Sequence, residues 1–114
     1  AEDPKALMEE LDRLIVRLED LVARINLTNS GTVYEGKTIT ELLAHRDCLK
    51  KKVRVLRDFL NTASDRVTRM TRTEIKIVST VPVSEIQKTV DGLAKELRTV
   101  DEKIQELNWT TELV

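Results

Sequence analysis

The sequence predicts a mainly α-helical fold, an elongated bundle of three long amphipathic helices with a small β hairpin or strand element. Three stretches repeat apolar residues at alternating spacings of four and three, the heptad pattern of helices that pack along their length. Of the 114 residues, 40% are hydrophobic and 34% are charged, which suits helices with one buried and one solvated face. This length corresponds to a single helical domain, residues 1–114.

The first helix is expected at about residues 4–26. Asp3 can cap its free N–H groups, and Pro4 is favourable at the first helical position. The apolar seam of this helix consists of Leu7, Leu11, Leu14, Leu18, Leu21 and Ile25. A second stripe of Met8, Ile15 and Val22 makes the apolar face wider than a two-stranded coiled coil needs. We therefore expect this helix to contact more than one neighbour.

The β element is expected at about residues 32–39 and 73–81. Val33-Tyr34 and the segment 37–39 flank Glu35-Gly36, where the glycine supplies the positive φ of a hairpin turn. Farther along, Ile75 and Ile77 alternate with polar residues at the period of a strand. This strand could pair with the hairpin.

The second and third helices are expected at about residues 41–63 and 85–107. Thr38 or Thr40 caps the second helix, whose seam is interrupted by Arg46, which we expect to snorkel or to pair with a carboxylate. Ser84 and Gln87 match a capping box for the third helix. Its seam is formed by Ile86, Val90, Leu93, Leu97, Val100, Ile104 and Leu107.

Charge is distributed unevenly although the formal net charge is only −1. Residues 45–76 contain ten Lys or Arg and four Asp or Glu, whereas residues 1–27 and 84–114 each contain four basic and seven acidic residues. A basic helix between acidic ones favours electrostatic pairing within a bundle or between subunits. The alternative is a nucleic-acid surface formed by Lys50, Lys51, Lys52, Arg54, Arg57, Arg66, Arg69 and Arg72. The near-zero net charge and the shortage of aromatic residues favour pairing.

Candidate chemistry is confined to one helical face. Glu41, His45 and Cys48 follow the spacing i, i+4 and i+7, and each residue type can bind zinc. No second ligand pair accompanies them, so a partly exposed histidine beside a small thiol explains the pattern more simply. A Cys48–His45 dyad would lack an oxyanion site, and the sequence contains no Gly-rich phosphate loop. We expect neither enzyme activity nor a cofactor.

The sequence also bears on where the protein acts. It has no apolar run of about 20 residues for a membrane-spanning helix and no basic start followed by an apolar run that would mark a secretory signal. A single cysteine fits a reducing compartment. We expect a cytoplasmic protein.

Several segments resemble a family of small bacterial proteins named septicolysin-like. They are Arg24–Asn29, Gly36–Thr40 followed by Arg46-Asp47, Glu74–Lys76 before Ser79–Val81, and the closing Asn108–Leu113, which is the most specific. The resemblance covers nearly the whole chain, although members of that family carry a further helical stretch ahead of the Ala1–Pro4 position. It implies a coiled-coil-like bundle that assembles into oligomers, and the family name implies a pore-forming cytolysin.

The leading functional hypothesis is a non-enzymatic protein that assembles as a homo-oligomer through its apolar seams. The predicted interface residues are Leu7, Leu11, Leu14, Leu18, Leu97, Ile104 and Trp109. The alternative is a pore-forming toxin, in which the segment 72–83 would have the length and alternation of a membrane strand. Nucleic-acid or metal binding are further alternatives.

Overall fold

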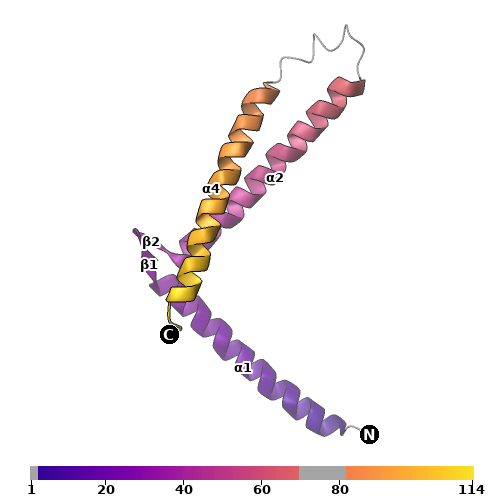
Figure 1. The fold of residues 1–114 in the computed structure, drawn as a ribbon. Helices are drawn as coiled ribbons and strands as arrows, with labels where there is room; N and C mark the ends of the chain where they lie inside the picture. Colours follow the sequence, from indigo (N-terminus) through magenta and orange to yellow (C-terminus); the bar gives the residue numbers. More distant parts are fainter. Residues whose placement is uncertain (1–2, 70–81) are drawn as a thin grey trace.

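The computed structural model describes residues 3–69 and 82–114 and confirms the mainly α-helical fold (Figure 1). Its elements, in chain order, are α1 (Pro4–Gly31), β1 (Val33–Tyr34), β2 (Lys37–Thr38), α2 (Ile39–Arg69) and α4 (Val83–Thr110). Each helix is longer than predicted, with 28 residues in α1, 31 in α2 and 28 in α4. The strand predicted at residues 73–81, and its pairing with the hairpin, lie almost entirely outside the described residues.

The molecule is elongated because α1 does not pack along the other two helices. α2 and α4 lie side by side, whereas α1 meets them near its C-terminal end and points away (Figure 1). The principal extents are 72 × 47 × 16 Å and the radius of gyration is 23.3 Å. A compact domain of this length would have a radius of gyration of about 13 Å. The three seams therefore have different surroundings.

The hydrophobic core lies between α2 and α4. Val53, Leu60 and Val90 form a buried cluster against which the side chains of Leu56, Ile86 and Leu93 pack. The other buried apolar residues of the described part are Ile39, Leu49, Ile104 and Leu107. The heptad seams of α2 and α4 thus cover each other.

A two-stranded antiparallel hairpin connects α1 to α2, as predicted. Val33 pairs with Thr38 and Tyr34 with Lys37. Glu35 and Gly36 form the turn with φ of 48° and 81°. Two consecutive positive φ values are typical of a type I′ turn, in which Gly36 adopts its conformation without steric cost.

Side chains define the starts of α1 and α2. The Asp3 carboxylate accepts a hydrogen bond from the Lys5 N–H at 3.0 Å, which confirms the predicted cap. Before α2, the Thr38 hydroxyl accepts from the Glu41 N–H at 3.1 Å, and the Glu41 carboxylate accepts from the Thr38 N–H at 3.3 Å. This reciprocal pair is a capping box.

The capping box predicted for the third helix is wrong. α4 begins at Val83, one residue before Ser84, and its cap residue Pro82 has no side-chain hydrogen bond. The Ile86 N–H instead donates to the Pro82 carbonyl at 3.0 Å. Because Ser84 already lies inside the first turn, it cannot occupy the cap position, and Gln87 donates its side-chain N–H to Asp91.

Candidate functional site

The candidate site is the exposed apolar face of α1. Leu7, Leu11, Leu14 and Leu18 are between 47% and 60% exposed. Met8, Ile15, Val22 and Ile25 extend the same face and are also exposed. Of the α1 residues, only Thr28 near the C-terminal end is buried. The predicted interface residues on this helix therefore remain uncovered by their own chain, unlike the seams of α2 and α4.

The face forms a continuous stripe with two different edges. From Leu7 to Ile25 it extends about 27 Å along the helix axis at 1.5 Å per residue. Met8, Ile15 and Val22 recur every seventh residue along one edge and are apolar. Glu10, Arg17 and Arg24 recur at the same interval along the other edge and are charged. The stripe thus has the chemical layout of a coiled-coil surface with one widened side.

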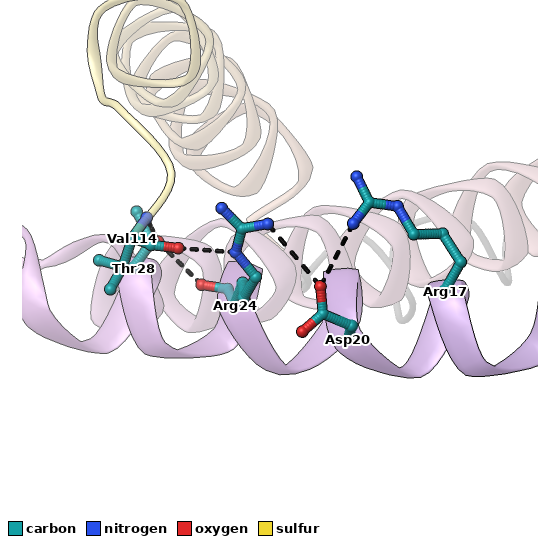
Figure 2. A network of polar contacts seen from close by, with 5 residues as sticks. All are labelled: Arg17, Asp20, Arg24, Thr28 and Val114. Carbon is teal, nitrogen blue, oxygen red and sulfur yellow. Dashed lines mark hydrogen bonds and ion pairs between the residues drawn. The ribbon is translucent and has the colours of Figure 1, made fainter.

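A polar network holds the C-terminal end of α1 against the end of the chain (Figure 2). The Thr28 hydroxyl donates to the Arg24 carbonyl at 2.8 Å and accepts from the Val114 N–H at 2.9 Å. The Arg24 Nε donates to the Val114 carbonyl at 2.7 Å. These contacts join α1 to the segment that follows α4, so they help to set the direction in which α1 leaves the hairpin.

The same network continues along α1 through ion pairs. The Asp20 carboxylate forms ion pairs with Arg24, at 3.7 Å, and with Arg17, at 3.4 Å (Figure 2). All three side chains are at least 38% exposed, so solvent screens these pairs and each contributes little to stability. The sequence pattern alone does not predict this network. The sequence contains one indication of it, because Thr28 is a polar residue at a position of the apolar seam, seven residues after Leu21.

Two open hollows lie beside the junction of the helices. One, of about 390 Å³, is lined by Ile25, Thr28, Asn29, Ile39, Asn108, Thr111 and Leu113. Because no charged side chain lines this hollow, it offers no acid, base or ion-binding group. It lies where α1, the start of α2 and the C-terminal end of α4 meet.

The second hollow, of about 320 Å³, contains His45 and Lys103 beside Tyr34. The Lys103 ammonium lies 4.4 Å from the centre of the Tyr34 ring and 2.9 Å from the Glu106 carboxylate. The hydrogen bond with Glu106, followed by the contact with Tyr34, raises the pKa of Lys103. Lys103 therefore stays protonated and cannot act as a general base at neutral pH.

The three predicted metal ligands have separate environments. Glu41 belongs to the capping box, His45 lies 3.1 Å from the Glu96 carboxylate, and Cys48 is exposed. Within residues 3–69 and 82–114, no three His, Cys, Asp or Glu residues are grouped closely enough to hold a metal ion. A site at these positions would need Glu41 and His45 to leave their present partners, and it stays a prediction.

The predicted interface residues of the third helix differ in their exposure. Trp109 is 89% exposed and available to a partner, whereas Leu97 is half-buried. Ile104 is only 1% exposed. Its assignment to an interface between copies is corrected here, because its side chain is already enclosed within the chain.

The structure describes the side chains of the charged residues of α2 as far as residue 63. Arg46, 24% exposed, pairs with Asp47 at 3.2 Å and with Asp101 of α4 at 3.6 Å, as the expectation of a carboxylate partner required. Arg66, Arg69 and Arg72 fall where side chains are not described. The proposed nucleic-acid surface stays a prediction. Among the described helices, none is both long enough and apolar enough to cross a membrane.

The chain belongs to a family of unknown function, DUF6847, whose model matches residues 1–113. It is also similar to the crystal structure of a functionally unknown conserved protein from Corynebacterium diphtheriae, with 45% identity and a TM-score of 0.87. That match covers 100% of this chain and 75% of the other, so it includes α1. No curated protein matches the sequence.

Proposed function

We propose that this protein is a non-enzymatic assembly protein whose α1 binds a second copy of the same chain. The observation that carries the proposal is the exposure of five of the six seam residues from Leu7 to Ile25, on a helix that points away from the rest of the molecule (Figure 1). Single exposed apolar residues are ordinary on protein surfaces, but a contiguous apolar stripe marks an interaction surface.

The size of the stripe supports a stable interface. Its eight seam and edge residues are each 46–67% exposed; they are Leu7, Met8, Leu11, Leu14, Ile15, Leu18, Val22 and Ile25. Together they present on the order of 800 Å², the area that each partner contributes to a standard protein interface. Burying this area between two copies would remove the largest apolar surface of the described residues from water.

The chemistry of the hollows favours assembly over catalysis. The larger hollow contains no charged side chain, and in the smaller one His45 contacts the Glu96 carboxylate. Enzyme sites combine a nucleophile or acid–base pair with groups that stabilise developing charge. We therefore place the function of the described region in binding, and we place the binding surface on α1.

The first test compares two substitutions on opposite faces of α1. Leu14 is 60% exposed on the seam, and Val16 is 64% exposed on the opposite side of the helix. In the assembly, Leu14→Glu would bury a carboxylate at the interface of both copies, whereas Val16→Glu would leave the carboxylate in solvent. The masses of the wild type and both variants are measured by sedimentation equilibrium over a range of concentrations.

We expect a wild-type mass that is a multiple of 13.0 kDa, an unchanged mass for Val16→Glu and a monomer for Leu14→Glu. Circular dichroism checks that α2 and α4 remain helical, since neither substitution touches their core. A monomeric wild type at high concentration would overturn the proposal. So would equal dissociation by both variants, because the effect would then not depend on the seam.

An exposed amphipathic helix could instead bind a membrane, as the resemblance to septicolysin-like proteins implies. The charges around α1 disfavour this alternative, because residues 1–27 contain seven acidic and four basic residues and anionic lipid attracts basic faces. Dye-loaded vesicles of neutral and of anionic lipid provide the measurement. Release by the wild type that Leu14→Glu abolishes would replace assembly by pore formation as the function of this surface.

A further inference from the structure

We infer that two copies join through α1 in antiparallel orientation, with Leu11 of each copy beside Leu14 of the other. This inference rests on the proposed function and specifies the geometry of that interface. It comes from the two edges of the stripe, which differ in charge and therefore distinguish one orientation and one register from the others.

In an antiparallel helix pair, each edge of one helix meets the same edge of its partner. The apolar edge then meets itself, so that Met8 of one copy lies beside Ile15 of the second copy. The charged edge also meets itself. With Leu11 opposite Leu14, Glu10 of one copy faces Arg17 of the second copy, and the two-fold symmetry repeats this pair.

Other registers bring like charges together. Sliding the pair by one heptad towards the N-terminal ends places Glu10 opposite Glu10 of the second copy, and sliding it by one heptad the other way places Arg17 opposite Arg17. Like charges that face each other across a helix pair are destabilising. Each shifted register also brings opposite charges together on this edge, Asp3 with Arg17 in the first case and Glu10 with Arg24 in the second. Only in the intermediate register is every contact of the edge between opposite charges, since Asp3 then faces Arg24.

A parallel pair is disfavoured for a different reason. In that orientation the charged edge of one helix lies against the apolar edge of the other. Glu10 and Arg17 would then be partly desolvated beside Ile15 and Val22, respectively, without an opposite charge. In the single chain, Arg17 pairs with Asp20 at 3.4 Å and is 63% exposed, so its guanidinium can reorient towards a carboxylate of the second copy.

α2 of the second copy fits the stripe less well, although its basic charge is complementary to α1. On the described part of α2 the exposed large apolar residues are Val55 and Phe59, which are one helical turn apart. They could cover only a short part of a stripe about 27 Å long. Among the described surfaces, α1 of the second copy has the matching composition, and in the inferred register residues 4–21 of the two helices lie side by side. Ile25 lies beyond this overlap.

Spin-label distances separate the orientations. Cys48→Ser removes the exposed native thiol, and a nitroxide is then attached at Ala23→Cys or at Arg13→Cys, both outside the seam. In the inferred register the two labelled residues are offset along the helix axis by about 32 Å at position 23 but by only about 2 Å at position 13. The lateral separation of the two helices adds to both distances. A parallel pair gives nearly equal distances at both positions.

The expected result of the double electron–electron resonance measurement is therefore a much longer distance at position 23 than at position 13. Equal distances would overturn the antiparallel orientation while leaving assembly through α1 intact. No interspin distance at either position, together with a monomeric mass, would overturn the proposed function itself. The two failures are thus distinguishable in one set of samples.

Charge exchange tests the register. Glu10→Lys or Arg17→Glu alone creates two like-charge contacts and should weaken the dimer about tenfold, whereas the double variant restores opposite charges and should recover wild-type affinity. Glu9→Lys is the matched control, since it makes the same charge change on the solvent side of α1. Failure of the double variant to recover, or equal weakening by Glu9→Lys, would overturn the register.

Discussion

Thr28 provides a test of the polar network that fixes the end of α1. Its side chain is 6% exposed, and its hydroxyl both donates to the Arg24 carbonyl and accepts from the Val114 N–H. Thr28→Val keeps the shape of the side chain but removes both hydrogen bonds. Because Val114 is 71% exposed, water can partly solvate its freed N–H, so the loss should be near the lower end of the range for an unsatisfied buried group. We expect the free energy of unfolding to fall by about 1 kcal/mol.

Urea unfolding at one fixed protein concentration measures this loss, since assembly would otherwise make the stability depend on concentration. Thr99→Val is the matched control. The Thr99 hydroxyl also donates to the carbonyl four residues earlier, at 3.1 Å, but it lies on the exposed side of α4. We expect its effect to stay within about 0.5 kcal/mol. Equal losses for Thr28→Val and Thr99→Val would refute the claim that the contact with Val114 stabilises the junction.

Three further predictions concern the fold. Ile104→Ala should lower the free energy of unfolding by about 2–4 kcal/mol, because the side chain is 1% exposed and its removal leaves a cavity; thermal unfolding at fixed concentration measures this. Glu41→Ala removes one half of the capping box before α2 and should cost about 0.5–1 kcal/mol in urea unfolding, whereas Glu41→Gln should retain most of that contribution. Gly36→Ala places a side chain at a φ of 81° and should cost about 1 kcal/mol in the same assay, although no neighbouring atom obstructs the added Cβ.

Local sequence signals predict that the helices and the hairpin form, but they predict the ends of the helices less well. The end of α1 was predicted at residue 26 because the Asn, Thr and Ser residues that follow often compete with helical hydrogen bonds. In the structure, the hydroxyls of Thr28 and Ser30 donate to the carbonyls of Arg24 and Leu27 within the helix. The hydroxyls thus bond within the helix rather than ending it, and α1 continues to Gly31.

The candidate site shows what periodicity can and cannot establish. Leu14 and Ile104 both belong to the apolar seams of similar heptad repeats, yet the first is 60% exposed and the second is 1% exposed. A heptad pattern identifies the face that a helix should bury but not the partner that buries it. His45 illustrates the same limit, because its contact with Glu96 comes from 51 positions farther along the chain. The spacing to Cys48 could not indicate that contact.

The seam of α1 is exposed whereas the seams of α2 and α4 are buried, and this difference gives a physical reason to expect assembly. Within the described residues, the α2–α4 core is a narrow layer of aliphatic side chains, and α1 adds Thr28 but no large apolar residue to the buried set. A helix without tertiary contacts along most of its length is only marginally stable in water. Pairing of α1 with a second copy would supply the missing apolar contacts, so that the free energy of assembly would also stabilise the helical conformation of α1.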